Sequence, residues 1–371
     1  MPAGTQTKVV SAENAFGFAL LRATMHGGNV FISPFSVGQA LGVVYLGARG
    51  DTAQAFVKSS VVPSVDSADY ACASQNLRAD LPQPDADVML QFANALWLRQ
   101  GLTLKSGFVQ SAHDAFGADV SALDFASPDA LRTINGWVSQ QTKGHIPTIL
   151  DSLGNAEAII TNAVYFKGAW AKVFSASQTA PEHFAGSTGV TTVPFMRQTG
   201  TMSYYAGSGY QLVRLGYAGD RFAMYVVLPA RGGGLTMAGS LAQTFADALA
   251  HATPRRVELH LPKMHLAYDV NLVSPLSSLG LGVAFSDRAN FSGISDLPMK
   301  ITGVIHKTTL DVDEKGTTAT AATAVVMEAT AIYEPPKPPV VVKVDHPFFC
   351  IIRDDSSGAL LFLGAIANLN S

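Results

Sequence analysis

Apolar residues recur with helical spacing near the amino terminus of this chain, and further on they form short continuous or alternating runs. In the amino-terminal third the spacing is helical. Phe16, Leu20 and Ala23 lie on one face of a helix for which Ser11 is the expected cap. A second apolar stretch over residues 36–46 predicts another helix, because two glycines follow closely and would end it.

Two further helices are expected from the same kind of pattern. Asp51 is a suitable cap for a helix beginning at Thr52. Residues 129–142 form an amphipathic segment, since Ile134 and Val138 share one face and polar residues occupy the other.

Short apolar or alternating runs typical of strands dominate the rest of the chain: 88–98, 158–166, 222–228, 257–261 and 359–367. Helices and strands are mixed without a regular βαβ alternation, which predicts an α+β fold with large, mainly antiparallel sheets. Neither an internal repeat nor a linker is evident, so residues 1–371 are expected to form a single domain.

One segment combines strand character with the composition of a loop. Residues 316–331 are Gly, Thr, Ala and Val with one Met and one Glu, and Pro335, Pro336, Pro338 and Pro339 follow. Small and β-branched residues favour a strand but offer little surface to bury, and the prolines prevent continued pairing. Local conflicts of this kind concentrate at functional sites.

Composition excludes several classes of protein. With 371 residues, 48% of them hydrophobic, the chain can bury a large core, and its net charge of -3 contains no block of like charge. We therefore expect neither a nucleic-acid partner nor a membrane partner. Residues 1–10 do not resemble a signal peptide, so the location is cytoplasmic if Met1 is the native start and extracellular if an upstream signal was removed.

Motifs for catalysis and for cofactors are missing. The Gly-x-Ser-x-Gly pattern fails because Ala206 precedes Ser208, and neither His-Glu-x-x-His nor Cys-x-x-Cys occurs. The two cysteines, Cys72 and Cys350, are too few for a disulfide scaffold and are expected to be buried free thiols. These patterns predict a protein that is not an enzyme and that holds no cofactor and no metal.

Six segments, taken in order, resemble the serpin family over nearly the whole chain. They are 29–36 (NVFISPFS), 46–52 (LGARGDT), 162–170 (NAVYFKGAW), 261–263 (LPK), 313–317 (DEKGT) and 345–349 (DHPFF). The resemblance implies the serpin fold, with three β-sheets, eight or nine helices and an exposed reactive-centre loop at about 314–340. It also implies a monomeric inhibitor that traps serine proteases as a covalent acyl-enzyme, after which the cut loop inserts into the large sheet.

The resemblance assigns roles to individual residues of the loop. Its hinge comprises Glu314, Gly316, Thr317, Thr318, Ala319, Thr320, Ala321, Ala322 and Thr323. The implied reactive bond joins Thr330 to Ala331. The proline-rich stretch before Val340 is longer than is usual in the family, so cleavage at Ala329, Ile332 or Tyr333 stays open.

Two further groups of residues are implied by the resemblance, a shutter beneath the opening strands and a breach where insertion begins: Ser33, Ser36, Asn162 and His306, then Trp170, Lys263 and Glu314. Both have an ordinary structural interpretation as well. A buried histidine with polar partners is common in protein cores, and an exposed Lys263–Glu314 pair would contribute little stability.

The loop composition also predicts the class of target. Between Gly316 and Pro336 there is no Arg or Lys, and Lys337 is followed by Pro338. A trypsin-like pocket, whose carboxylate requires a basic partner, is therefore disfavoured, and elastase-like or chymotrypsin-like proteases, subtilisin types included, are expected. The alternative is a non-inhibitory carrier, chaperone or storage serpin, whose hinge would carry bulky, charged or proline residues.

Two other features of the family are not supported by the sequence. Residues 69–80, where some serpins bind heparin, contain a single basic residue, Arg78, so no heparin site is expected. The one glycosylation sequon, at Asn290, is expected to be unmodified because no secretion signal is present.

Overall fold

The computed structural model describes residues 2, 4–81, 87–316 and 338–370, and the helices precede most of the strands. The α-helices of the described residues are α1 (Thr5–Thr24), α2 (Pro34–Gly47), α3 (Gly50–Lys58), α4 (Ser67–Ala79), α5 (Ser106–Phe116), α6 (Pro128–Gln141), α7 (Leu241–His251) and α8 (Val273–Leu276). Short helical turns are η1 (Ala176–Gln178), η2 (Gly234–Gly239), η3 (Ser277–Leu281) and η4 (Gly282–Phe285).

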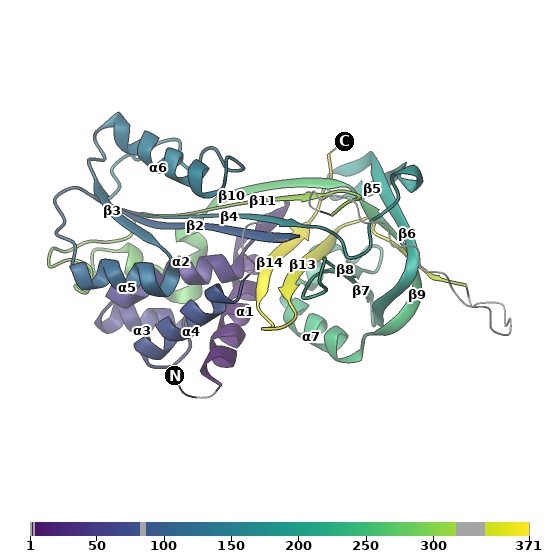
Figure 1. Cartoon of the computed structure of the whole chain (residues 1–371), viewed down its shortest axis with the longest axis horizontal. Helices are drawn as coiled ribbons and strands as arrows, with labels where there is room; N and C mark the ends of the chain where they lie inside the picture. Colours follow the sequence, from purple (N-terminus) through teal and green to yellow (C-terminus); the bar gives the residue numbers. More distant parts are fainter. Residues whose placement is uncertain (1, 3, 82–86, 317–337, 371) are drawn as a thin grey trace.

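A five-stranded sheet crosses the middle of the molecule (Figure 1). Its strands, in spatial order, are β10 (Met264–Asn271), β11 (Gly303–Val312), β4 (Ala158–Gly168), β2 (Val88–Arg99) and β3 (Asp119–Leu123). The central neighbours β11 and β4 are parallel, with Gly303 opposite Ile159 and Thr309 opposite Tyr165. The chain that connects these two parallel strands is long. It leaves β4 at Gly168, passes through β5 (Ala180–Gly186) to β10, and returns to pair with β4 at Gly303.

The second sheet has nine strands and consists of two parts that share one long strand, β6 (Gly189–Gly207). Residues 189–195 of β6 pair with β5, residues 195–204 pair with β9 (Thr253–Pro262), and β12 (Val340–Lys343) pairs with β9. The end of β6 pairs with β7 (Tyr210–Gly216), followed by β8 (Phe222–Pro229), β13 (Phe348–Asp354), β14 (Leu360–Ile366) and β1 (Val30–Ile32). The three sheets implied by the resemblance therefore correspond to the five-stranded sheet and these two joined parts.

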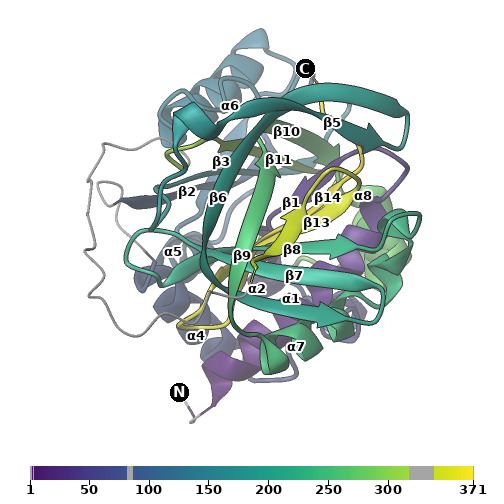
Figure 2. The same ribbon diagram turned by 90° about the vertical axis from the view of Figure 1, so that its right-hand side faces the viewer.

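Helices cover the five-stranded sheet unequally. Figure 1 shows α2 and α5 against its lower side in that view and α6 alone on its upper side. Figure 2, turned by 90°, shows β6 and β9 crossing in front of that sheet at one end of the molecule. One face of the sheet is thus buried over a helical layer and the other is partly open.

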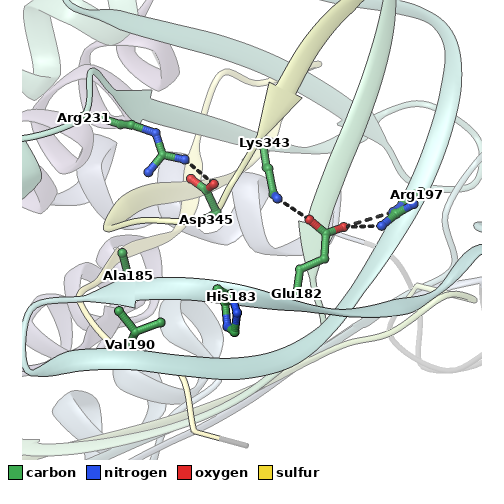
Figure 3. A pocket seen from close by; sticks show the side chains of 8 residues that line it. All are labelled: Glu182, His183, Ala185, Val190, Arg197, Arg231, Lys343 and Asp345. Carbon is green, nitrogen blue, oxygen red and sulfur yellow. Dashed lines mark hydrogen bonds and ion pairs between the residues drawn. The ribbon is translucent and has the colours of Figure 1, made fainter.

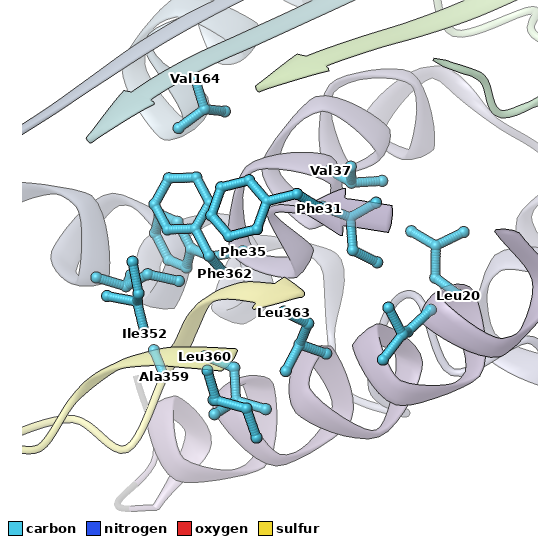
Figure 4. Close-up of a cluster of buried hydrophobic side chains, with 14 of the residues drawn as sticks. Leu20, Phe31, Phe35, Val37, Val164, Ile352, Ala359, Leu360, Phe362 and Leu363 are labelled. Carbon is cyan, nitrogen blue, oxygen red and sulfur yellow. The ribbon is translucent and has the colours of Figure 1, made fainter. Parts of the chain in front are cut away.

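The main core lies between the sheet, α2 and the strands β13 and β14 (Figure 4). Phe31 and Phe362 stack with ring centroids 5.1 Å apart, and in this view Val164 lies above them and Phe35 beside them. Burying a large apolar side chain stabilises the fold by about 1.5–3 kcal/mol, so this aromatic cluster joins the helical layer to both sheets.

The predicted strands are present with boundaries within a few residues, and so is the predicted amphipathic helix, which is α6. Two predicted caps are wrong. The first helix begins at Thr5 rather than after Ser11, because Val9 is fully buried and the apolar face extends upstream. Asp51 lies inside the first turn of α3, which begins at Gly50, where its charge still complements the helix dipole.

Both cysteines are free, as expected, but only Cys350 is buried, since Cys72 is partly exposed on α4. Among the helices of the described ranges, none is both long and apolar enough to cross a bilayer.

Candidate functional site

The predicted site residues that the structure describes gather at two places, around the middle of β11 and around the turn that follows it. Glu314 and Gly316 follow its carboxyl end, and His306 lies in its middle. The rest of the predicted hinge, Thr317 to Thr323, lies outside the described residues, as do the implied bond Thr330–Ala331 and the alternatives Ala329, Ile332 and Tyr333. The described part of the loop therefore consists of its two ends.

A tight turn follows β11 and is held by backbone hydrogen bonds. The N–H of Asp313 donates to the carbonyl of Gly316 at 3.0 Å, and the N–H of Gly316 donates back at 3.2 Å. The carboxylate of Asp313 also accepts from the N–H of Lys315 at 2.8 Å. These bonds fix the direction in which the chain leaves the sheet toward residue 317.

Gly316 lies so close to the end of β4 that only glycine fits. Its φ is 112°, and a Cβ placed on it would lie 2.3 Å from the carbonyl oxygen of Gly168 and 2.5 Å from the nitrogen of Trp170. Positive φ and steric exclusion both select glycine here. This hinge glycine is thus seated against the end of β4.

Glu314 pairs with Lys263 at this turn. Lys263 Nζ lies 2.8 Å from Glu314 Oε2, and the hydroxyl of Thr179 donates to Oε1 at 2.8 Å. Burial raises the pKa of the Glu314 carboxyl, but the hydrogen bonds from Lys263, its own backbone and Thr179 outweigh it and leave that pKa below its usual range. Glu314 is therefore an anion that ties the turn to Lys263, which joins β9 to β10, and to Thr179, which precedes β5.

Trp170 connects the turn to the second sheet. Its indole N–H donates to the carbonyl of Asp313 at 2.9 Å, and its backbone N–H donates to the carbonyl of Lys315 at 3.1 Å. The indole ring stacks on Tyr217 with centroids 4.6 Å apart, and Tyr217 is fully buried. The N–H of Phe174 also donates to the backbone carbonyl of Glu314 at 2.8 Å. The turn is thus anchored to the aromatic core through the side chain of Trp170.

The second group forms a polar row across three strands. His306 of β11, Asn162 of β4 and Asn94 of β2 are direct register partners, and all three are almost completely buried. The Nδ1–H of His306 donates to the side-chain oxygen of Asn162. The amide group of Asn162 in turn faces the side-chain oxygen of Asn94. The row spans the place where β4 and β11 meet.

The start of α2 closes the row from below. Ser33 caps this helix by accepting from the N–H of Ser36 at 3.2 Å, and Pro34 at the first helical position favours initiation there. The N–H of Ser33 donates to Nε2 of His306 at 3.0 Å, and the amide of Asn162 donates to the carbonyl of Ser36 at 3.1 Å. The strands and the start of α2 are therefore joined through backbone and side-chain groups of these four residues.

The imidazole of His306 is neutral. Nε2 accepts a hydrogen bond, so Nδ1 carries the proton. Burial lowers the pKa of His306 to about 3. Each ring nitrogen therefore has one complementary partner, and parting β4 from β11 would leave at least one of them unsatisfied.

Sequence reasoning missed Asn94 and Thr308. The hydroxyl of Thr308 is fully buried and donates to the carbonyl of Phe31, which joins β11 to β1. Asn94 is a polar residue at an otherwise buried strand position, and a buried amide within an apolar run is the signal that would have indicated it.

The other end of the loop enters β12, whose lysine is bound to a buried carboxylate (Figure 3). Lys343 Nζ lies 2.6 Å from Glu182 Oε2, and Arg197 and His260 contact Oε1 at 2.9 Å each. Burial raises the pKa of Glu182, but its three partners more than compensate and leave the pKa lowered. This cluster holds β12 against β5.

Within the described ranges, no group of three or more His, Cys, Asp or Glu side chains is arranged to hold a metal ion. The chemistry available at both places is hydrogen bonding and ion pairing around one strand and the turn that follows it.

Comparison with known proteins shows which family this chain belongs to. The family model described as Serpin (serine protease inhibitor) matches residues 11–369. A serpin-like protein of Thermococcus kodakarensis is 35% identical over 98% of this chain and 87% of that protein. The leukocyte elastase inhibitor of Bos taurus is 32% identical over 92% of this chain and 93% of its own. The native-state structure of Tengpin, a thermophilic serpin, superposes with a TM-score of 0.88 at 27% identity, covering 97% of this chain and 94% of that one.

Proposed function

The chain belongs to the serpin family and has the serpin fold, and from this premise we propose that it inhibits serine proteases by trapping. A target protease attacks the segment between Glu314 and β12 and forms an acyl-enzyme through its own serine. The cut segment then inserts between β4 and β11 before the acyl bond is hydrolysed, and it carries the protease with it. The matching family model describes a serine protease inhibitor, not a catalyst.

The parallel pairing of β4 and β11 is the observation that carries this proposal. A segment that reverses direction after β11 runs antiparallel to it. Because β4 is parallel to β11, the same segment also runs antiparallel to β4. Insertion therefore replaces one parallel pairing with two antiparallel pairings, which are somewhat more stable per residue.

The composition of the hinge suits this movement. In a strand, successive side chains point to opposite faces, so Thr317, Ala319, Ala321 and Thr323 would share the face turned toward the buried helical layer. All four are small and uncharged, and burying them costs far less than burying an ionised group. An insert of about 15 residues at about 3.3 Å each displaces the protease by roughly 50 Å.

The hydrogen bonds at both places oppose insertion until the segment is cut. The chain beyond Gly316 cannot enter the sheet unless the bond from Trp170 to Lys315 is released, and β4 cannot leave β11 unless the Asn162–His306 bond is broken. The intact loop is also tied at its far end by β12. Cleavage removes that second tie, which makes the rearrangement possible only after protease attack.

The expected targets are elastase-like or chymotrypsin-like serine proteases, subtilisin types included. The absence of Arg and Lys between 316 and 336 leaves the carboxylate of a trypsin-like pocket unpaired, which costs on the order of 10⁴-fold in specificity. The similarity to a leukocyte elastase inhibitor supports the same class of target.

A panel of proteases tests this proposal. We expect an elastase-like or chymotrypsin-like enzyme to form a complex that survives denaturing electrophoresis, with release of a peptide whose mass identifies the cut bond. Association with trypsin at matched concentration should be slower. Cleavage of the loop by every member of the panel without a stable complex would contradict inhibition and would favour the non-inhibitory alternative, while faster inhibition of trypsin would contradict only the proposed target class.

A further inference from the structure

Two hollows meet at Arg231, away from the breach and the shutter. One, of about 630 Å³, is lined by the charged cluster around Glu182 (Figure 3). The other, of about 430 Å³, lies beyond Ala185 and is bordered by the end of α1, the β5–β6 hairpin, η2 and the segment that joins β12 to β13. Its walls come from segments far apart in the sequence, and the function proposed above does not use it.

The second hollow has the dimensions and walls of a small-molecule site. Met25, Leu235, Pro347 and Ala367 supply apolar surface from four different segments. Several glycines border it, and a Cβ on Gly28 would meet no atom within 4 Å. Ligand pockets in proteins typically enclose about 300–1,000 Å³ and combine apolar walls with a few polar groups.

The polar groups around this hollow include one exposed cation, Arg231, which is paired with a buried carboxylate. The buried carboxylate of Asp345 accepts from Arg231 and lies 2.9 Å from His346 Nδ1. His346 Nε2 lies 2.7 Å from the carbonyl oxygen of Pro229, which can only accept. Because a carbonyl oxygen can only accept, Nε2 of His346 is the donor in that contact.

Arg231 has donors to spare. Its guanidinium contacts Asp345 through Nη2 alone among the described residues, and 66% of the side chain is exposed. Figure 3 shows it directed at Asp345, with Ala185 below on the hairpin that borders both hollows. A guanidinium presents five N–H donors and binds carboxylates in a bidentate manner, so a second anion can bind without displacing Asp345.

We propose that this hollow, the Arg231 pocket, binds a small amphipathic monocarboxylate. The apolar body would lie against Met25, Leu235 and Pro347, and the carboxylate would accept hydrogen bonds from Arg231. The unused N–H donors of Arg231 favour an anion over an uncharged analogue, and the apolar walls exclude strongly hydrated anions such as inorganic phosphate.

A matched pair of probes tests the pocket, 1-naphthoate and its uncharged analogue 1-naphthamide. Isothermal titration calorimetry gives their affinities, and the ¹³C-methyl resonance of Met25 in methionine-labelled protein reports the location, with Met89 on β2 as an internal reference. We expect 1-naphthoate to bind about tenfold more tightly than 1-naphthamide, as one charge-assisted contact implies. The Met25 resonance should move while that of Met89 stays in place.

Two arginine variants separate the hollows. Arg231→Gln should bring the affinities of the two probes within about twofold of each other, while Arg197→Gln, which alters the neighbouring hollow only, should leave the preference intact. Gly28→Phe, at a position open to a side chain, should block both probes.

Thermal midpoints confirm that each variant is folded. An unmoved Met25 resonance at millimolar 1-naphthoate, equal affinities for both probes, or loss of the preference in Arg197→Gln alone would overturn the proposal.

Discussion

His306 is the residue that reports most directly whether β4 and β11 are together. It bonds Asn162 across the two strands and Ser33 on the helix below, and it is fully buried as a neutral imidazole. Its hydrogen-bond geometry and its protonation are therefore linked. Any change in the spacing of these strands also changes the environment of this ring.

This linkage predicts a loss of stability in acid. The pKa of His306 is about 3 in the folded protein, so between the ordinary histidine value near 6.5 and pH 3 the unfolded chain binds a proton that the folded chain does not. Stability therefore falls as pH falls. Between pH 7 and pH 5 the contribution of His306 to the free energy of unfolding should decrease by about 2 kcal/mol.

The measurement is the difference between wild-type protein and His306→Gln in urea unfolding at pH 7 and pH 5. The variant should be less stable than wild type at pH 7 and should lose about 2 kcal/mol less on acidification. The buried Glu13, whose pKa burial raises to about 8, contributes with the opposite sign but is common to both proteins and cancels. Parallel pH dependences for the two proteins would refute this role.

Residue-scale contacts were only partly predictable from the sequence. The resemblance indicated Ser33, Ser36, Asn162 and His306, and the structure places them in one hydrogen-bonded group. Asn94 completes the row but was missed, because its role depends on the cross-strand register between β2 and β4, which a single sequence does not reveal.

At the scale of elements, the central relation is between β11 and the segment that follows it. The strand ends in a turn pinned by Trp170 and Lys263, and small residues follow directly. Along the chain, the residues that we propose to enter the sheet are therefore joined directly to the turn that follows β11.

A pair of arginine variants tests which face of the hinge becomes buried. Thr317→Arg should place a charge toward the buried layer and slow insertion, and each 1.4 kcal/mol added to the barrier slows it about tenfold. Hydrolysis of the acyl-enzyme then competes, so several inhibitor molecules are cut for each protease trapped. The stoichiometry of inhibition with an elastase-like protease measures this effect.

The matched control is Thr318→Arg, which adds the same charge one residue later, on the opposite face of the future strand. Its stoichiometry should stay close to that of wild type. If Thr317→Arg leaves the stoichiometry unchanged, the proposed insertion does not bury this face.

Elements were more predictable than their ends. The strand runs and α6 could be located because their apolar periodicity extends over many residues. The caps at Ser11 and Asp51 were misplaced because apolar contacts, such as the burial of Val9, decide where a helix begins. The sharing of β6 by two parts of one sheet also depends on long-range pairing and has no local signal.

At the scale of the whole molecule, trapping by insertion requires that the intact protein is not in its most stable arrangement. The five-stranded sheet carries a parallel pair, β4 and β11, at its centre. Gln91 of β2 and Thr309 of β11, which lie on either side of Tyr165 of β4, each have a buried oxygen without a hydrogen-bond partner among the described residues. Unsatisfied buried polar atoms raise the free energy of a folded state. Cleavage and insertion would replace the parallel pair with antiparallel ones.

The most direct test of the trapping mechanism is the thermal midpoint of the protein before and after a single cut between 317 and 336. A metalloprotease makes the cut without forming an acyl-enzyme, so no protease is retained, and mass spectrometry confirms the nick. About ten new backbone hydrogen bonds at about 1 kcal/mol each, and about 2 °C per kcal/mol for a chain of this size, predict a rise on the order of 20 °C. Nicked Thr317→Arg should rise less. Equal midpoints for intact and nicked wild-type protein would contradict insertion, and with it the proposed mechanism of inhibition.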